Sequence, residues 1–223
     1  MDKPSLPAER QSFFYKLLFV VFVILLPFAL GSSTAIFDDG DVSWHIAAGQ
    51  WMFANGRIPA TDPFSFTMAG SPWVAHEWLA EIIYAAAFNA AGHAGLAAVV
   101  SLAILVTFLV TFWHLHSRTG PVALLVAFAA LAIVLTPFEL ARPHILVWPL
   151  LALWTAVLLR HRDSGRAPPL ALALLMLVWA NLHGSYPLGL VVAGAMALDA
   201  MIAARWDRRL LGHWLLFGTT SLA

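Results

Sequence analysis

Carboxylates and an imidazole gather in one short stretch near the start of the chain. Asp38, Asp39 and Asp41 are followed by His45, four residues after Asp41. In a helix this spacing places Asp41 and His45 on one face, within reach of each other. The group could supply a general base, bind a divalent cation through Asp39, Asp41 and His45, or only cap a helix in a hydrated loop.

Other polar residues that could act as bases, ligands or substrate-binding groups occur later in the chain. The segment HEWLAE at 76–81 begins like the HExxH motif of zinc proteases, but Ala80 stands where the second histidine belongs, which excludes that site. Arg142 and His183 lie at the ends of apolar segments, where a polar group usually faces a cavity or a partner. The alternatives are headgroup contact for Arg142 and an interhelical hydrogen bond for His183. The candidates of this second group are His76, Glu77, Arg142, His144 and His183.

The composition defines the class of protein that positions these residues. Of 223 residues, 61 % are hydrophobic and 11 % are charged, and the mean hydropathy is +0.82. A soluble domain has about 25 % charged residues, so this chain could not cover a water-facing surface. Twelve basic residues balance twelve acidic ones, which gives no indication of a nucleic-acid partner, and the absence of cysteine excludes disulfides and thiolate metal sites. The sequence predicts an integral membrane protein whose first partner is the lipid bilayer.

Apolar segments divide the chain into membrane spans. A spanning helix needs about 20 mostly apolar residues. We therefore expect an all-α polytopic protein with about seven transmembrane helices, forming a single transmembrane domain over residues 1–223. The first span also resembles a cleaved signal peptide, and the seventh, which begins near Leu210, reaches the chain end unfinished, as expected of a truncated protein. The first six expected spans are, in order, 17–35, 96–113, 122–137, 145–159, 170–182 and 188–204.

The apolar stretch 78–91 decides which loops lie on which side. If it does not cross, ten of the twelve Lys and Arg residues fall on one side, and only Arg57 and Arg142 fall on the other. Cytoplasmic loops collect Lys and Arg, so this arrangement predicts a cytoplasmic N-terminus. Glu77 and Glu81, one helical turn apart, also suit a helix lying on the outer leaflet better than a buried one.

The same topology gives a long first outer loop, residues 36–91, with two amphipathic helices. The first covers 41–55, where Gly40 precedes it and Gly56 ends it; the second is the stretch 78–91. Trp44 and Trp51 are seven residues apart and suit the interfacial belt. Most acidic residues and five histidines then collect at the outer end of the spans.

This order of elements resembles the N-terminal region of the bacterial multi-spanning glycosyltransferases of the GT-C superfamily, which include the protein O-mannosyltransferases and the lipid A aminoarabinose transferases. The resemblance is carried by the segments DDGDVSWHIAAGQWMFANGRIP, ATDPFSFTMAGSPW and VAHEWLAEIIYAAAFNAAG. It is closer still to uncharacterised bacterial membrane proteins with a D-x-x-W-H-x-x-x-G core, a D-P-F-S-[FY]-T link, an H-E-W-L-A-E helix and a later N-L-H-G. The characterised enzymes often carry Asp-Glu followed by Arg-Tyr, whereas Asp41 is followed by Val-Ser-Trp-His.

The resemblance implies inverting transfer of a sugar from a polyprenyl-phosphate donor to an acceptor hydroxyl, at the outer face of the bacterial inner (plasma) membrane. It implies that Asp41 is the general base, and that Asp39 or His45 orients it or helps to hold a divalent cation. It also implies that Arg142, with His144 or His183, stabilises the departing lipid phosphate. The remaining substrate-binding candidates are Arg57, His76, Glu77 and Trp44.

Two other classes of protein are compatible with the same sequence. One is a transporter or lipid-handling membrane protein that keeps this fold without sugar-transfer chemistry, and the other is an inactive scaffold subunit. Transporters concentrate polar groups near the middle of the bilayer and interrupt their helices there. In this chain the polar residues collect at the outer ends of the spans, which favours the glycosyltransferase.

Overall fold

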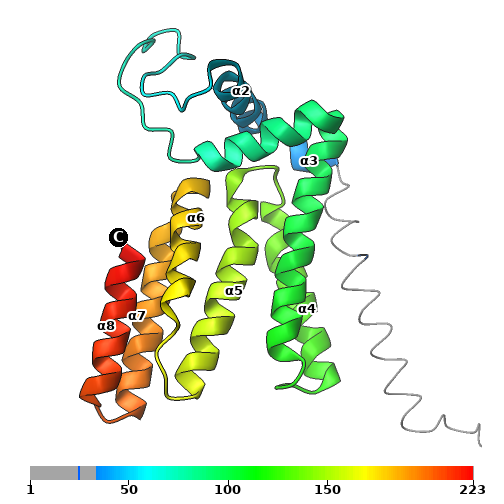
Figure 1. The fold of residues 1–223 in the computed structure, drawn as a ribbon. Coiled ribbons are helices and arrows are strands. Elements are labelled where there is room, and N and C mark those ends of the chain that lie inside the picture. Colours follow the sequence, from blue (N-terminus) through cyan, green and yellow to red (C-terminus); the bar gives the residue numbers. More distant parts are fainter. Residues whose placement is uncertain (1–24, 26–33, 223) are drawn as a thin grey trace, which may run out of the picture.

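The structure is a computed structural model in which residue 25 and residues 34–222 are described. This part of the chain is all-α, as predicted, with helices packed side by side and no strand among the described residues (Figure 1). Most of the first expected span, 17–35, lies outside the described residues. The α-helices are α2 (Gly40–Asn55), α3 (Trp78–Leu115), α4 (Pro121–Leu135), α5 (Pro143–Asp163), α6 (Leu174–Leu182), α7 (Tyr186–Ala203) and α8 (Arg208–Leu222).

Four helices of the described part are long and apolar enough to cross a membrane. They are α3, α4 with the short 3-10 turn that follows it, α5 and α7. The apolar helix Leu170–Leu182, which contains α6, and the 15-residue α8 are shorter. Fifteen residues span about 22 Å as an α-helix, against about 30 Å of hydrocarbon. The structure thus supports a membrane protein with four spanning helices.

Helix α3 consists of two helices joined at a sharp bend. Ala91 and Gly92 have non-helical backbone angles, and Gly92 has a φ of 59°. Glycine adopts this left-handed conformation without strain, which other residues rarely do. Figure 1 shows the result: the first half of α3 lies across the end of the bundle, and the second half runs alongside α4. The stretch 78–91 therefore does not continue in the direction of the long helices.

Helix α2 rests on the first half of α3 at very short range. A Cβ atom added to Gly49 would lie only 2.1 Å from the backbone oxygen of Glu81, so only glycine permits this approach. The helix begins after Asp39, whose carboxylate accepts the backbone N–H of Asp41, and ends at Gly56, which has a φ of 63°. The predicted helix 41–55 and its two flanking glycines are thus present.

Two apolar clusters hold the long helices together. One joins α3, α4 and the start of α5, with the rings of Phe108 and Phe128 5.3 Å apart at its centre. The other joins α5 to α6, α7 and α8, around Trp154, Trp179 and Phe217. The Trp154 indole N–H is satisfied by the backbone oxygen of Gly189 at 2.9 Å, as a buried donor requires. Because α5 packs into both clusters, the two clusters together hold its N-terminal end in place.

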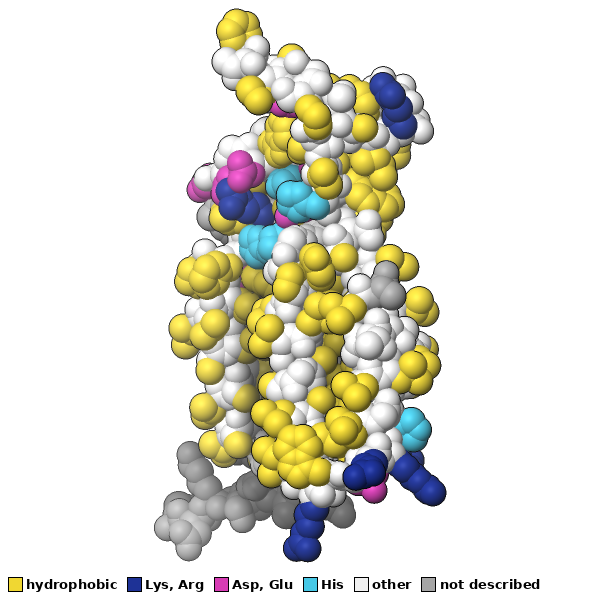
Figure 2. All heavy atoms as spheres, turned by 90° about the vertical axis from the view of Figure 1, so that its left-hand side faces the viewer, with side chains coloured by type: hydrophobic (Ala, Val, Ile, Leu, Met, Phe, Trp, Pro, Cys, Tyr) yellow, Lys and Arg dark blue, Asp and Glu magenta, His cyan; other side chains and the backbone are white. Residues whose placement is uncertain are grey.

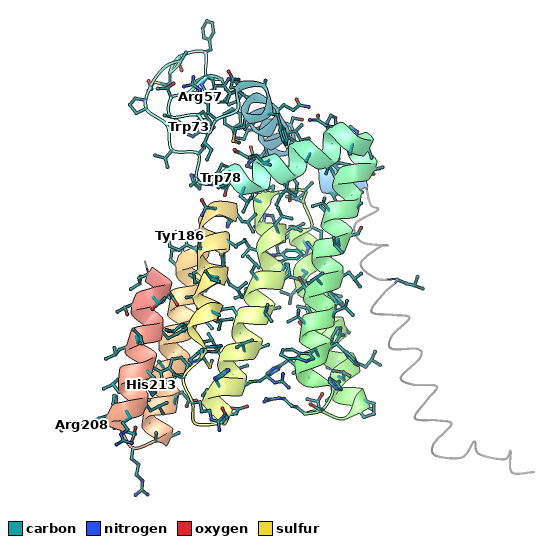
Figure 3. The ribbon with its side chains drawn as sticks, in the orientation of Figure 1. Arg57, Trp73, Trp78, Tyr186, Arg208 and His213 are labelled. Atoms are coloured by element: carbon teal, nitrogen blue, oxygen red, sulfur yellow. The ribbon has the colours of Figure 1, made fainter. Side chains whose placement is uncertain are left out.

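Arginines gather at the end of the bundle away from α2. The connections from α3 to α4, α5 to α6 and α7 to α8 all lie there, and Figure 3 shows Arg208 at this end and Arg57 at the other. Arg162 binds both Asp163 and Asp199, and Arg118 binds Asp163 at 2.6 Å. The basic residues of this end are Arg118, Arg160, Arg162, Arg166, Arg205, Arg208 and Arg209.

Candidate functional site

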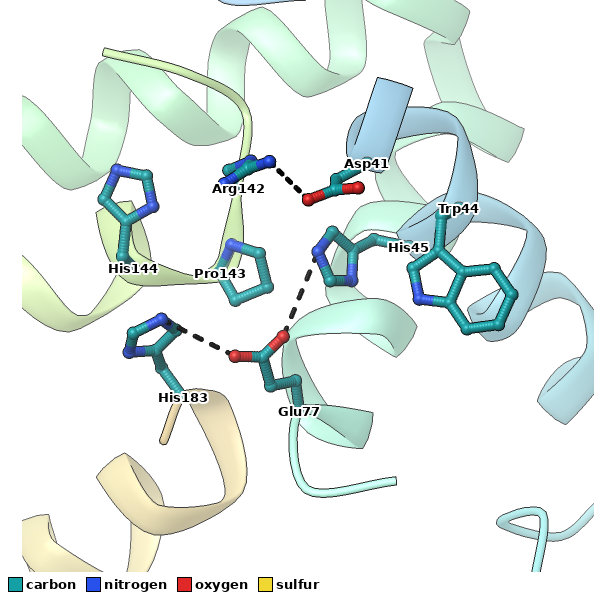
Figure 4. A pocket seen from close by; sticks show the side chains of 8 residues that line it. All are labelled: Asp41, Trp44, His45, Glu77, Arg142, Pro143, His144 and His183. Carbon is teal, nitrogen blue, oxygen red and sulfur yellow. Dashed lines mark hydrogen bonds and ion pairs between the residues drawn. The ribbon is translucent and has the colours of Figure 1, made fainter. Parts of the chain in front are cut away.

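A pocket of about 300 Å³ lies where α2 and the first half of α3 cover the end of the bundle (Figure 4). Four separate parts of the chain meet in it: the first turns of α2, the residue before α3, the start of α5 and the residue after α6. Figure 2 shows its charged and imidazole side chains side by side, directly above a largely hydrophobic surface. The lining residues are Asp41, Trp44, His45, Glu77, Arg142, Pro143, His144 and His183.

Arg142 is the cation of this pocket and is held by two carboxylates. Its Nη2 donates to Asp39 Oδ1 at 3.0 Å and also to Asp41 Oδ2, and its Nε lies 2.8 Å from Asp39 Oδ2. The pKa of Asp39 is lowered, first by the hydrogen bond from the Asp41 backbone N–H and then by the guanidinium. The pKa of Arg142 is raised, mainly by Asp39. Both groups are therefore ionised at neutral pH.

Asp41 and His45 do not pair with each other, which corrects the expectation drawn from their spacing. Asp41 binds Arg142, whereas His45 is buried and faces Glu77 and Glu81. The i, i+4 spacing does bring both residues into one pocket, as predicted. Asp41 pairs with Arg142 and not with His45 because a guanidinium offers its carboxylate a stronger, charge-assisted hydrogen bond.

Glu77 stands between imidazoles. His183 Nε2 lies 3.5 Å from its carboxylate, and His45 Nε2 and His76 Nε2 each lie 3.9 Å from it. His183 Nδ1 accepts the backbone N–H of Ser185 at 3.1 Å, so in the neutral ring the proton sits on Nε2, toward Glu77. Burial lowers the pKa of His183, and the Glu77 charge partly opposes this. The Glu77 carboxylate is thus surrounded by three imidazoles that come from different parts of the chain.

His144 forms the wall beside His183. The centroids of the two rings are 6.2 Å apart, and His144 Nε2 lies 2.8 Å from the backbone oxygen of Phe138. A neutral imidazole donates through this nitrogen, which leaves Nδ1 as an acceptor. His144 and His183 are thus both in the pocket, one from the start of α5 and the other from the residue that follows α6.

Two of the predicted binding residues lie outside the pocket lining. Arg57 stands over the Trp51 ring at 5.7 Å in the outer loop, because the turn at Gly56 leads the chain away from the site (Figure 3). The His76 side chain is 63 % exposed, and its Nε2 lies 3.9 Å from Glu77 Oε1 at the edge of the site. Trp44 does line the pocket, and its ring is backed by Phe64 and Trp73 at centroid distances of 4.7 and 5.7 Å.

Sequence reasoning missed the residues that hold the site together from behind. The buried Tyr84 hydroxyl donates to the backbone oxygen of Arg142 at 2.6 Å, and the Trp78 indole N–H donates to Asn181 Oδ1 at 2.6 Å. Glu81 is 3 % exposed and lies 3.5 Å from His45. Glu77, Glu81 and Tyr84 are spaced at i, i+4 and i+7 on one helix face, which is the signal that could have grouped them.

The described residues do not form a metal site. Among them, no three His, Asp or Glu side chains converge as ligands would. Asp39 and Asp41, two of the three candidate ligands, are occupied by a guanidinium, which repels a cation placed beside it.

The arrangement offers three chemical groups at the height where the apolar helices end. These are a guanidinium that can bind a phosphate, an exposed carboxylate that can accept a proton, and the Glu77–imidazole group. Protein-family models, curated proteins and solved structures give no match to this chain.

Proposed function

We propose that the chain is a membrane glycosyltransferase of the GT-C type, which transfers a sugar from a polyprenyl-phosphate donor to an acceptor hydroxyl at the outer face of the bacterial inner membrane. The observation that carries the proposal is the convergence of Asp41 and Arg142 in one pocket, 101 residues apart in sequence, at the end of the apolar helices. A phosphate headgroup stands at this height when its prenyl chain lies along the bundle.

Arg142 is the group that receives the donor phosphate. A guanidinium matches phosphate oxygens with two parallel hydrogen bonds, and the imidazoles of His144 and His183 line the same pocket. Pro143 at the first position of α5 fixes the chain direction just after Arg142. The residues of the α5 start therefore hold the leaving group.

Asp41 is the general base in this proposal. It takes the proton of the acceptor hydroxyl as that oxygen attacks the anomeric carbon of the sugar. The bond from the anomeric carbon to the phosphate oxygen breaks, and its electron pair leaves with the lipid phosphate, whose charge Arg142 compensates. Attack opposite the leaving group inverts the anomeric configuration. A positioned base of this kind contributes about 10²–10⁴-fold to the rate.

The aromatic group Trp44, Phe64 and Trp73 suits the sugar. Its three rings pack edge to face or tilted, which holds Trp44 rigidly at the pocket wall. A rigid indole beside a polar pocket offers an apolar surface for the C–H face of a sugar ring. We assign Trp44 the role of sugar platform.

The proposed topology places this pocket outside. In this topology the first half of α3 lies on the outer leaflet and the N-terminus is cytoplasmic. The shorter helices α6 and α8 also cross the membrane, beside α3, α4, α5 and α7. The arginines at the opposite end support this orientation because cytoplasmic loops collect Lys and Arg.

A transporter would need polar groups in the middle of the bundle. Two of the buried polar residues of α3, Thr107 and Ser101, lie at this depth, and the Thr107 hydroxyl is bonded to the backbone oxygen of Ala103 in its own helix. The pocket lined by Asp41 and Arg142 lies at the bundle end instead. This distribution supports sugar transfer over transport.

Sugar transfer by the full chain in proteoliposomes tests the proposal. A panel of polyprenyl-phosphate sugars is supplied with membrane-lipid acceptors, and labelled product is counted. Asp41→Asn should lower the transfer rate by about 10²–10⁴-fold. Asp38→Asn is the matched control, because it removes the same charge from the same segment without touching Arg142, and it should stay within about twofold. A rate that Asp41→Asn leaves unchanged, or no transfer from any donor, overturns the proposal.

A further inference from the structure

We propose that the Asp41–Arg142 ion pair is exchangeable: the donor phosphate replaces Asp41 on the guanidinium, while Asp39 keeps its contact. This inference rests on the phosphate-linked donor of the proposed function. It gives the two neighbouring carboxylates different roles, with Asp39 as a positioning residue of Arg142 and Asp41 as the group that the substrate releases.

Asp39 is built into the structure. Its side chain is 18 % exposed, and it approaches two nitrogens of Arg142. The same carboxylate also accepts the Asp41 backbone N–H at 2.9 Å and so caps α2. Removing Asp39 from the guanidinium would break contacts on both sides, so Asp39 stays in place when a ligand arrives.

Asp41 is held far more loosely. Its side chain is 56 % exposed, and one of its oxygens contacts a single nitrogen of Arg142. After release it would remain in the first turn of α2, where the helix end favours a negative charge.

Arg142 has donors left for a phosphate. Its Nη2 makes both hydrogen bonds to the carboxylates, and its Nη1 has no hydrogen-bond partner among the described residues. The Nε atom is buried beside Asp39 Oδ2 at 2.8 Å, so it faces the carboxylate that stays in place, and the donors left for phosphate are those of Nη1. A guanidinium with free donors beside one replaceable carboxylate is suited to taking a phosphate oxygen.

The exchange would couple the two substrates. Without donor, one carboxylate oxygen of Asp41 is held by the Arg142 guanidinium and does not face an acceptor hydroxyl. Donor phosphate on Arg142 would free Asp41 to accept the proton of the hydroxyl. The base would therefore become available only after the donor is in place.

Binding of a phosphate lipid, measured without sugar transfer, tests the exchange. The probe is a fluorescent short-chain polyprenyl monophosphate in detergent micelles with the full-length protein, the matching polyprenol is the phosphate-free control, and inorganic phosphate is the competitor. Asp41→Asn should bind the monophosphate about tenfold more tightly, because it removes the competing charge. Asp39→Asn should bind it at least threefold more weakly, because Arg142 loses its holder. Asp38→Asn should stay within about twofold of the wild type.

The opposite signs are decisive, because simple electrostatics makes every loss of a negative charge tighten anion binding. If Asp39→Asn tightens binding, or if Asp41→Asn tightens it less than fivefold, the exchange is wrong. Asp39→Ser, which keeps the helix cap but cannot reach the guanidinium, replaces Asp39→Asn if that variant unfolds at a lower temperature. The protein could prefer the monophosphate to polyprenol while the affinities of the variants do not follow the predicted order. That result overturns the exchange but not the proposed function. If the protein does not prefer the monophosphate, the exchange and the proposed function are both wrong. If the affinities follow the predicted order but no sugar is transferred, only the proposed enzymatic activity is wrong.

Discussion

The Tyr84 hydroxyl donates a 2.6 Å hydrogen bond to the backbone oxygen of Arg142. This contact joins the half of α3 that lies across the bundle to the residue that carries the guanidinium. Tyr84 is fully buried, so its hydroxyl has no water to replace this partner. The position of Arg142 therefore depends on how the first half of α3 is seated.

Tyr84→Phe should disturb the site without creating a cavity. Loss of the hydrogen bond should cost about 1 kcal/mol of stability, and it should weaken polyprenyl monophosphate binding because Arg142 is less firmly placed. Thermal unfolding and binding in detergent micelles measure the two effects. Tyr186→Phe is the control, since Tyr186 is 40 % exposed, and it should change neither. An unaltered affinity in Tyr84→Phe would show that this bond does not position Arg142.

Gly49→Ala should separate α2 from α3. The added Cβ would lie 2.1 Å from the Glu81 backbone oxygen and 2.6 Å from the Ala85 Cβ, so one helix must move. We expect the free energy of unfolding to fall by about 1–3 kcal/mol, which is typical of overpacking. Gly40→Ala is the control, because its Cβ would meet no atom within 4 Å. Melting temperatures that fall equally in both variants would argue against the close packing of α2 on α3.

Glu139 should make the stability of the protein depend on pH. Its side chain is buried with Oε1 lacking a hydrogen-bond partner, and burial raises its pKa from 4.5 to about 7. The folded state therefore holds this proton more tightly than the unfolded state. The stability that this contributes is complete below pH 4.5 and is lost as the pH rises through about 7.

Glu139→Gln should remove this dependence. Its melting temperature relative to the wild type should rise between pH 5 and pH 8, because the wild type alone must bury a charge at the higher pH. A difference in melting temperature that is constant across this range would show that Glu139 does not titrate there.

The local parts of the site could be predicted from the sequence. Gly40 and Gly56 mark the ends of α2, and a spacing of four residues places Asp41 and His45 in the same pocket. The composition predicts an all-α membrane protein, because few charges and long apolar segments leave no other fold class. These inferences depend only on helix geometry and on polarity.

The partners across the bundle could not be predicted. Asp39 and Arg142 are 103 residues apart, and their contact depends on the bend at Gly92 and on the close approach at Gly49. Arg57 is a predicted substrate-binding residue, but the turn at Gly56 leads it away from the pocket. The side of the membrane on which each loop lies limits which residues can come into contact. The way the helices bend and pack decides which of them do.

Accessibility of single cysteines tests the sidedness on which the proposed enzyme depends. The chain has no cysteine, so each introduced thiol reports alone. Ser43→Cys lies on α2, Ala90→Cys lies just before the bend of α3, and Ser164→Cys follows α5 at the arginine-rich end; all three positions are exposed. In intact cells, a membrane-impermeant maleimide should label the thiols at 43 and 90, and the thiol at 164 only after permeabilisation. Labelling at 164 in intact cells, or opposite sidedness of 43 and 90, would contradict an outward-facing pocket.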